Sequence, residues 1–322
     1  MRVVLLGAGG FLGKRLGAHL AKTARIAGEA IDELVLFDLR PVHPPTTSAC
    51  PLTTLHGDLR ESAALDALCD KPLDLVLHFA ATLTVDAEKD FRRGLDTNVL
   101  AFAALLERCR MQASPPMLLF ASSIATFGGQ LPPVVGDDVF QAPATSYGTH
   151  KTIAELLLAD YTRHGFVDGR ALRLPIVVTH PGPSSGSISD QVAALIREPL
   201  RGQRTTCQMA PDSRLVTASV DKVIEGFLLL AGLPASALHA SCTMNLPGLT
   251  VTPAEIVQAA ARHGSPGSSE LVVWKPEAQV QQIIDGWPKA FTSERALALG
   301  FTSDASADAL VQSFLAQEHA QP

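Results

Sequence analysis

The sequence predicts an α/β protein in which a doubly wound parallel sheet is followed by a smaller, mostly helical C-terminal region. Three observations lead to that prediction. Short apolar runs alternate with helical patterns through residues 1–174, which is typical of β-α-β units with helices on both faces of a sheet. The first apolar run passes directly into a glycine-rich turn. From residue 175 the chain becomes richer in turn-forming residues.

The expected strands are short apolar runs bounded by residues that favour turns. They cover residues 2–6, 33–38, 52–55, 73–79, 116–121 and 170–174. One expected helix follows the glycine turn and ends near residue 23, and the others cover 61–69, 86–110 and 147–164. A loop with three prolines separates the second strand from the third, because proline disfavours both a helix interior and a central strand.

Composition limits the classes of partner and compartment. The 322 residues are 47% hydrophobic and 18% charged, enough for a core, and the net charge of −6 comes without a basic stripe. We therefore expect no nucleic-acid partner. The five cysteines include no Cys-x-x-Cys pair, which predicts reduced thiols in a cytoplasmic protein and no metal site. The first residues predict a strand rather than a signal peptide, and no apolar stretch is long enough to cross a membrane.

The turn at residues 7–13 has the pattern of a phosphate-binding loop. Gly7, Gly10 and Gly13 follow a strand and open a helix, with Phe11 and Leu12 between the last two glycines. A pyrophosphate needs close backbone approach and free N–H groups at a helix N-terminus, which glycine permits. The context of strand, turn, helix and a later acidic strand end favours a dinucleotide site over a tight turn without a ligand.

Two acidic residues follow the second and third strands, where a dinucleotide would lie. Asp38 ends the second strand and could accept hydrogen bonds from both ribose hydroxyls, which favours NAD over NADP, although Arg40 could hold a 2′-phosphate. Asp58 and Leu59 follow the third strand and could contact the adenine, or Asp58 could cap the next helix.

The fourth strand ends in small residues. Ala80 and Ala81 would let a cofactor lie against the backbone, and His78 is expected to be a packed, hydrogen-bonded histidine. These features divide the chain into a Rossmann dinucleotide-binding domain at 1–174, rejoined by about 215–235, and a substrate-binding region at 175–322.

Tyr147 and Lys151 are four residues apart on an expected helix, so they share one face. A free phenol titrates near pH ~10 and is a poor base at neutral pH. A neighbouring ammonium favours the phenolate. The pair therefore predicts a proton-abstracting centre.

Together these motifs resemble the extended short-chain dehydrogenase/reductase family, the group of NAD-dependent epimerases and dehydratases. The resemblance is carried by the glycine turn, Asp38, His78 to Ala81, Asn98, Ser122-Ser123 and Tyr147-x-x-x-Lys151. It implies that Tyr147 is the general base, that Lys151 holds the nicotinamide ribose and that Ser123 binds the reacting oxygen. It also implies NAD as the cofactor, with Asn98 supporting Lys151 through water and Pro175 contributing a cofactor contact.

Within that family, long stretches look like dehydrogenases that oxidise carbon 2 of a four-carbon sugar acid to the 2-oxo acid. These stretches cover residues 120–129, 146–175, 196–200 and 245–249. The expected substrate contacts are Ser123, Thr84, Thr126, His180, Arg197 and Arg214. His180 stands where those dehydrogenases carry arginine before Pro-Gly, and the segment 215–219 lacks their aromatic and histidine residues. A less charged substrate therefore stays among the alternatives.

Two other functions are compatible with the same residues. A nucleotide-sugar epimerase that retains NAD would use the same tyrosine and lysine, and a non-catalytic dinucleotide sensor would keep only the binding site. A dehydratase is disfavoured, because Ile124 and Ala125 stand where it would need an acidic pair. The family resemblance suggests a homodimer that packs through the helices at 100–110 and 156–161.

Overall fold

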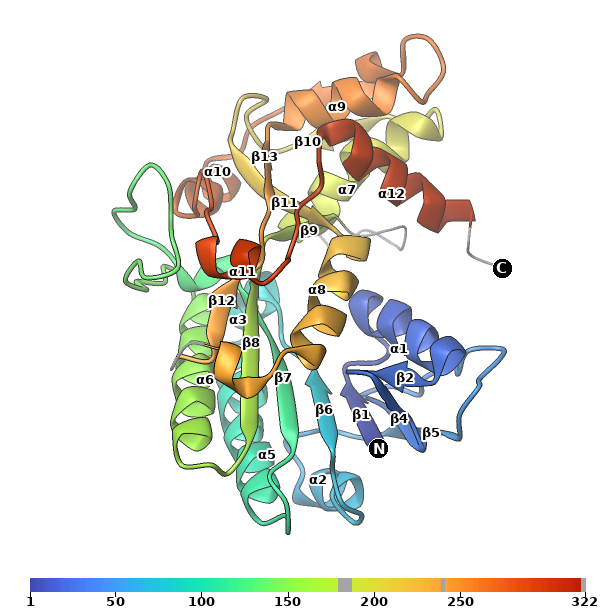
Figure 1. The fold of residues 1–322 in the computed structure, drawn as a ribbon. Helices are drawn as coiled ribbons and strands as arrows, with labels where there is room; N and C mark the ends of the chain where they lie inside the picture. The colour runs from blue at the N-terminus through green and yellow to red at the C-terminus, as the bar shows by residue number, and fades with distance from the viewer. Residues whose placement is uncertain (179–186, 239–240, 320–322) are drawn as a thin grey trace. The chain divides into compact units, whose positions relative to one another are not determined.

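The computed structural model describes residues 1–178, 187–238 and 241–319. The chain forms two compact units, each assembled from segments that lie far apart in the sequence (Figure 1). Unit 1 contains Met1–Ser123, Thr145–Arg173 and Ile224–Met244, and unit 2 contains Ile124–Ala144, Leu174–Val223 and Asn245–Pro322. The assignment of functional domains to residues 1–174 and 175–322 stays a prediction.

A parallel sheet lies at the centre of unit 1. Its order among the described residues is β12-β8-β7-β6-β1-β4-β5. The strands are β1 (Arg2–Leu6), β4 (Glu33–Asp38), β5 (Leu52–His56), β6 (Leu75–His78), β7 (Met117–Ser123), β8 (Asp168–Leu174) and β12 (Thr243–Asn245). The register pairs Leu6 with Phe37 on one side and with His78 on the other. The predicted α/β, doubly wound Rossmann fold is confirmed.

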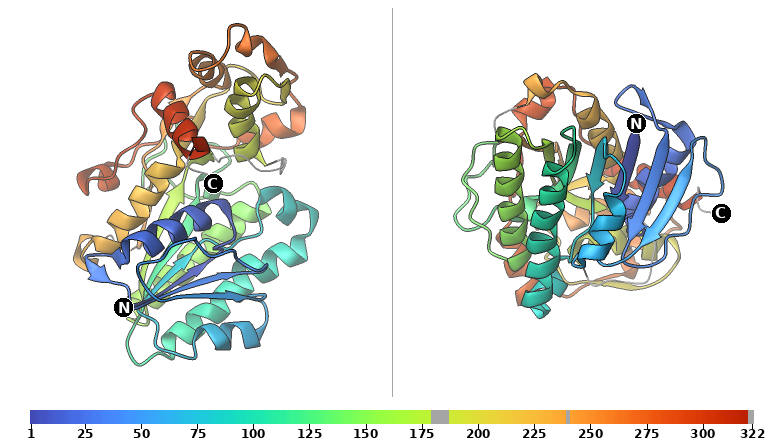
Figure 2. Two further views of the ribbon diagram at one scale, coloured as in Figure 1. Left: turned by 90° about the vertical axis from the view of Figure 1, so that its right-hand side faces the viewer. Right: turned by 90° about the horizontal axis from the view of Figure 1, so that it is seen from below.

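Helices cover both faces of this sheet. The elements between and after the strands are α1 (Phe11–Thr23), β2 (Arg25–Ile26), β3 (Glu29–Ala30), α2 (Ser62–Leu68), α3 (Thr84–Lys89), α4 (Phe91–Leu95), the π-helical η1 (Asp96–Leu100), α5 (Ala101–Arg110), α6 (Ser146–Arg163), α8 (Val220–Gly232) and η3 (Ala235–Ala237). Helices α2, α5 and α6 lie on one face, and α1 lies on the other together with residues 224–232 of α8 (Figure 2).

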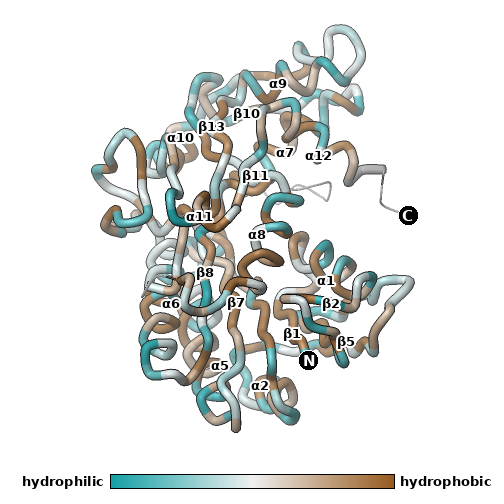
Figure 3. Tube along the Cα trace, viewed as in Figure 1, coloured by the Kyte–Doolittle hydropathy of each residue, from teal (hydrophilic) through white to brown (hydrophobic). Residues whose placement is uncertain are grey.

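The core of unit 1 follows from the alternation of side chains along its strands. Val4 and Leu6 of β1 are fully buried in one cluster with Phe102 and Leu106 of α5. Leu5 points the other way, toward Gly17 of α1. The central strands accordingly appear hydrophobic along their length (Figure 3). Because side chains on both faces of β1 are buried, β1 lies in the middle of the sheet. The glycine turn follows the carboxyl end of β1 and therefore lies at the carboxyl edge of the sheet.

One expected element was wrong. The region 86–110 is not one helix, because the chain breaks at Asp90 (φ −129°, ψ 83°) and then forms a π-helical turn at Asp96–Leu100. Asp90 caps the next helix, its side chain accepting a hydrogen bond from the N–H of Arg93 over 3.0 Å. Aspartate favours such a cap over a helix interior, and π-helical turns are frequent at functional sites.

Unit 2 combines small sheets with helices. Strand β11 pairs in parallel with β9 and antiparallel with β13, and β10 pairs with β14. Its elements are η2 (Ile124–Thr126), β9 (Ile176–Val178), α7 (Ile188–Leu200), β10 (Thr205–Cys207), β11 (Leu215–Ser219), β13 (Leu249–Val251), α9 (Pro253–Ala261), η4 (Ser268–Leu271), β14 (Val272–Trp274), α10 (Ala278–Asp285), α11 (Glu294–Ala298) and α12 (Ala307–His319). Its core packs α7 and α9 against β9 and β11.

Candidate active site

The strand order reverses between β1 and β6, and doubly wound folds bind ligands outside the carboxyl ends of the strands that flank such a reversal. Gly7 leaves β1 with φ +85°, and a Cβ there would lie 2.7 Å from the backbone nitrogen of Ala80. A Cβ at Gly13 would overlap the carbonyl oxygen of Gly7. Only glycine allows this close approach of turn, strand end and helix.

The N-terminus of α1 opens at the end of this turn. Gly10 is its N-cap, and no side chain caps the helix there. Phe11 and Leu12 begin the helix and are half-buried. The positive end of the helix dipole is therefore available to an anion such as a pyrophosphate.

Asp38 ends β4 at the same edge of the sheet. Its Oδ2 accepts a hydrogen bond from the N–H of Gly9 over 2.9 Å, and its Oδ1 accepts one from the N–H of Arg40 over 3.4 Å. The carboxylate is therefore held against the glycine turn. This arrangement presents a negative charge that would repel a 2′-phosphate.

Asp58 and Leu59 follow β5, and their surroundings differ. Arg60 binds both carboxylate oxygens of Asp58, and this hydrogen bonding lowers the pKa of that carboxyl. Leu59 is 8% exposed and belongs to the core. The alternative in which Asp58 caps the next helix is wrong, because Glu61 is the N-cap residue of α2.

Ala80 and Ala81 lie in the half-buried segment after β6, and Asn98 fixes the end of that segment. The side chain of Asn98 accepts from the N–H of Thr82 over 2.8 Å and donates to its carbonyl over 2.9 Å. Its amide nitrogen also lies 3.4 Å from Nδ1 of His150 on α6. Because Asn98 is in the π-helical turn, that irregular turn is what brings the amide to the segment.

His78 is buried at the end of β6, packed against Phe102 and Phe120 with ring centroids 5.1 and 5.7 Å away. Burial lowers its pKa to about 3, so the ring is neutral. The prediction of a packed histidine agrees with this, and Nδ1 has no hydrogen-bond partner among the described residues.

Tyr147, Ser123 and Lys151 come together on the adjoining strand and helix. Thr145 caps α6 by accepting a hydrogen bond from the N–H of Gly148, so Tyr147 lies in the first turn. The Tyr147 hydroxyl forms a hydrogen bond with the side chain of Ser123 at the end of β7. One turn later, Lys151 donates from Nζ to the carbonyl of Ala121 over 2.7 Å. The lysine Nζ lies 5.6 Å from the centre of the Tyr147 ring.

The electrostatics of this cluster are set by its poor solvation. Burial raises the pKa of Tyr147 to about 12, against a smaller opposing effect of the Ser123 hydrogen bond. Burial also lowers the pKa of Lys151 to about 7, while Glu155 opposes that shift. Both shifts favour the uncharged form, as desolvation does. A reactive phenolate therefore needs further positive charge near Tyr147.

Sequence reasoning missed two residues behind this cluster, Glu155 and Arg173, and gave Ser122 no role of its own. Ser122 donates to Oε1 of Glu155, and Arg173 of β8 binds both oxygens of the same carboxylate. The spacing of Glu155, four residues after Lys151, was the available signal, because it places both on one helix face. Nothing local identified Arg173, since its partner is 18 residues away.

The predicted substrate residues differ in how available they are. Thr84 is half-buried as the first residue of α3, and in unit 2 Thr126 is fully buried. Arg214 is exposed just before β11, whereas Arg197 is 3% exposed and pairs with Asp190 (3.1 Å) and Glu198 (2.6 Å). That pairing argues against Arg197 as a free anion-binding group.

The remaining predicted site residues lie in unit 2 or beyond the described part of the chain. Pro175 lies between β8 and β9, where a Cβ at Gly248 would approach its ring to 2.9 Å. His180 lies outside the described residues.

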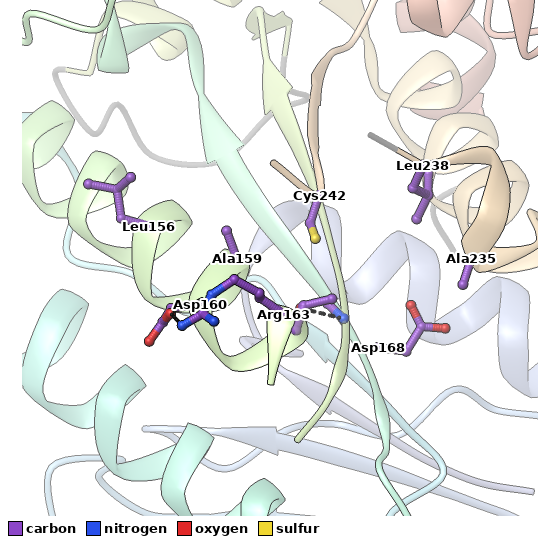
Figure 4. A pocket seen from close by; sticks show the side chains of 10 residues that line it. Leu156, Ala159, Asp160, Arg163, Asp168, Ala235, Leu238 and Cys242 are labelled. Carbon is purple, nitrogen blue, oxygen red and sulfur yellow. Dashed lines mark hydrogen bonds and ion pairs between the residues drawn. The ribbon is translucent and has the colours of Figure 1, made fainter. Parts of the chain in front are cut away.

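A separate open pocket of about 480 Å³ lies at the other end of α6 in unit 1. Leu156, Asp160 and Arg163 of the helix line it together with Asp168 and Cys242 (Figure 4). None of the predicted site residues lines this pocket. Its position does not connect it with the chemistry of Tyr147.

Comparison with known proteins identifies the family. Residues 3–234 match the NAD dependent epimerase/dehydratase family. The chain belongs to this family. A D-erythronate dehydrogenase of Cupriavidus necator is 40% identical over 319 residues, covering 98% of each chain. One of Haemophilus influenzae is 34% identical over 316 residues, covering 98% of this chain and 99% of the relative. The predicted resemblance to both the family and these dehydrogenases is confirmed.

One solved structure has a fold similar to that of this chain. The structure of a nucleoside-diphosphate-sugar epimerase from Agrobacterium tumefaciens has a TM-score of 0.94 and 29% identity, and the match covers 100% of this chain and 95% of that one. The predictions of an oxidoreductase and of NAD as its cofactor are confirmed by this membership. The residues present fit that cofactor, because the glycines leave a cradle that a Cβ would fill and Asp38 is held beside it.

The described residues contain no cluster of metal-binding side chains and no disulfide. No helix in that part of the chain has the length and hydrophobicity needed to span a bilayer.

Proposed function

We propose that this protein oxidises the carbon-2 hydroxyl of a short sugar acid, such as D-erythronate, to the 2-oxo acid. The observation that carries the proposal is the contact of Tyr147 with Ser123, one helical turn before the buried Lys151. The identity of 40% and 34% to two D-erythronate dehydrogenases over nearly the whole chain supports the substrate class.

In this reaction a hydroxyl proton and a hydride leave the substrate, and a carbonyl forms at carbon 2. Bound NAD supplies the hydride acceptor. Tyr147 takes the hydroxyl proton as general base, and Ser123 donates a hydrogen bond to the substrate oxygen. Lys151 supplies positive charge that favours the phenolate, which the protein by itself disfavours because burial raises the pKa of Tyr147 to about 12.

The glycine turn and neighbouring strand ends are the proposed NAD site. Gly7, Gly10 and Gly13 would admit the pyrophosphate to the start of α1, and Asp38 would accept from the adenosine ribose. The other proposed contacts are Phe11, Leu12, Asp58, Leu59, Ala80, Ala81, Asn98, Tyr147, Lys151 and Pro175. Of these, Leu59 is buried in the core, so we expect its backbone to make the contact.

The proposed substrate contacts are Ser123, Thr84, Thr126, His180, Arg197 and Arg214. A carboxylate is best bound by an arginine with free donors. The exposure of Arg214 and the ion pairs of Arg197 favour Arg214 for that role.

We further propose a cytoplasmic homodimer. Leu100 and Leu156 keep 49% and 65% of their surface exposed on the helix segments expected at the interface, and burying such residues favours association. None of the five cysteines, all of which the structure describes, forms a disulfide, as in a reducing compartment.

A nucleotide-sugar epimerase is the second candidate, supported by the structure from Agrobacterium tumefaciens. A screen of aldonic acids, uronic acids and simple secondary alcohols with NAD, read by NADH absorbance, separates the candidates. We expect NADH to accumulate with a short aldonic acid. Conversion of a nucleotide sugar without net NADH would support the epimerase instead. NAD binding without turnover of any of these compounds would support a dinucleotide sensor.

A further inference from the structure

Three consecutive residues of β7 contact three residues of α6 that are spaced one turn apart. The Ala121 carbonyl accepts from Lys151 over 2.7 Å, Ser123 bonds Tyr147, and Ser122 donates to Glu155. Tyr147, Lys151 and Glu155 therefore form one stripe of the helix against the end of one strand. The first two are the proposed catalytic pair, and the third is a buried acid with no part in the proposed reaction.

The carboxylate of Glu155 is surrounded by hydrogen-bond donors although the residue is only 4% exposed. Nε of Arg173 lies 3.1 Å from each carboxylate oxygen, and Nη2 lies 2.8 Å from Oε2. The Ser122 hydroxyl donates to Oε1. An arginine does not lose its proton in a protein, so this carboxylate is paired with a permanent positive charge.

The other groups around Lys151 add little charge. Phe120 and the Ala121 carbonyl face it from β7. On its own helix, Tyr147 carries a pKa of about 12, and on β6 His78 carries one of about 3, so both are neutral near pH 7.

Two more neighbours come from η1 and β8. Asn98 of η1, which packs on the same helix, is an uncharged amide, and Arg173 reaches from β8 to Glu155. Without Glu155, Lys151 and Arg173 would lose the carboxylate that interacts with both of them. Because the arginine keeps its proton, the lysine would lose its own.

We propose that Glu155 is a positioning residue that keeps the Lys151 amine charged, and that Arg173 and Ser122 hold the Glu155 carboxylate for this purpose. The catalytic part of this inference rests on the proposed function, because the charge on Lys151 matters for turnover only if Lys151 supports Tyr147. The electrostatic part concerns the protein alone.

The coupling between Tyr147 and Lys151 gives this proposal a specific signature. After one proton leaves the pair, the remaining proton can be on lysine, leaving the reactive phenolate, or on tyrosine, leaving an unreactive neutral pair. Glu155 lies one helical turn from Lys151 and two turns from Tyr147. Its negative charge therefore favours the form in which the lysine keeps the proton and the tyrosine is a phenolate. Raising the pH cannot restore that balance, because the two forms hold the same number of protons.

The direct test is a titration of the Lys151 amine in the cofactor-free protein, by NMR of lysine labelled with ¹⁵N at Nζ. Lys151→Arg assigns the signal. Glu155→Gln should lower the titration midpoint by about one pH unit, and Glu155→Asp should restore most of that difference. Asp308→Asn, which removes an exposed carboxylate bound by Arg262 in the same two-oxygen manner, should leave the midpoint unchanged. Equal midpoints in Glu155→Gln and the unsubstituted protein would overturn the proposal.

The pH profile of turnover provides the second readout. Glu155→Gln should lower the plateau of kcat and move its acid limb to lower pH, since removal of a nearby negative charge lowers the pKa of both members of the pair. A merely structural residue would lower the plateau without moving the limb, and that result would count against the proposal. If Tyr147→Phe retained full activity, the proposed function would fail, while the NMR titration would still decide the charge of Lys151.

Glu155→Gln removes the carboxylate that Arg173 binds and could prevent folding. The double variant Glu155→Gln/Arg173→Gln removes both buried charges and avoids that cost. Its Lys151 midpoint should lie below that of the unsubstituted protein, though less so than in the single variant, because the repelling arginine is also gone. A midpoint equal to or above that of the unsubstituted protein would contradict the role of Glu155.

Discussion

The backbone N–H of Gly9 donates a hydrogen bond to Oδ2 of Asp38 over 2.9 Å. A Cβ at Gly9 would lie 2.9 Å from Cγ of Asp38. The extra glycine of the turn thus makes room for the carboxylate and orients it. Asp38, which is expected to recognise the ribose, is therefore held in place by the backbone of Gly9.

Replacement of Asp38 by alanine should weaken NAD binding and reduce the preference for NAD over NADP by about tenfold, because the repulsion of a 2′-phosphate is removed. Dissociation constants for both cofactors measure the effect. Gly9→Ala should reduce the same preference, but should change it no further in the Asp38→Ala background. An unchanged NADP-to-NAD ratio in Asp38→Ala would refute its role in cofactor choice.

Tyr147→Phe removes the proposed base while keeping the ring. We expect NAD affinity within about threefold of the unsubstituted protein, and kcat lower by about 10²-fold or more, as for loss of a general base. Steady-state NADH production and cofactor titration measure the two quantities. Activity within about tenfold would exclude Tyr147 as the proton acceptor.

Gly13→Ala should abolish NAD binding and destabilise the fold, because the new Cβ would overlap the Gly7 carbonyl and the backbone would have to move. A cost of about 1–3 kcal/mol is typical of forced backbone shifts. Chemical denaturation and cofactor titration provide the measurements. Gly232→Ala is the control, since a Cβ there has no neighbour within 4 Å among the described residues. Equal behaviour of the two variants would contradict the close packing of the turn.

His78 should make the protein less stable in acid. Its pKa is about 3 when folded, below the ordinary 6.5, so its contribution is complete above pH 6.5 and is lost as pH falls toward 3. His78→Leu removes this titration. The loss of unfolding free energy between pH 7 and pH 5 should be smaller in the variant by about 2 kcal/mol. Urea denaturation at both pH values measures it, and parallel losses in the two proteins would contradict a neutral buried His78.

Arg214 and Arg197 should respond differently to substitution by glutamine. Arg214→Gln should raise KM for a sugar acid with little change in stability, because the exposed guanidinium is available to a carboxylate. Arg197→Gln should cost about 3–5 kcal/mol of stability, since it removes the buried guanidinium that pairs with Asp190 and Glu198. Kinetics with an acid and with its uncharged polyol distinguish the two. An unchanged KM in Arg214→Gln would remove it from the substrate site.

Much of the fold could be predicted because it depends on local pattern. The apolar runs at Arg2–Leu6 and Glu33–Asp38 match the observed strands. The prediction of a single helix over residues 86–110 was wrong, because the preference of Asp90 for a capping position outweighed the helical periodicity of the sequence. Ser123 and Tyr147, which the family resemblance assigned to the same reaction, are in contact, and their catalytic roles stay predictions.

The sequence by itself determined the strand–turn–helix that opens the chain and the placement of Tyr147 and Lys151 on one helix face. Both follow from the spacing of a few residues, because the geometry of a helix or strand fixes which side chains lie on the same face. Only the tertiary structure decided that Arg173 reaches Glu155 from a neighbouring strand, that Arg197 is paired inside unit 2, and that burial suppresses the charge of Tyr147. Those outcomes depend on the exclusion of solvent and on partners that the fold brings together from distant parts of the chain. Neither can be read from the pattern of residues along the sequence.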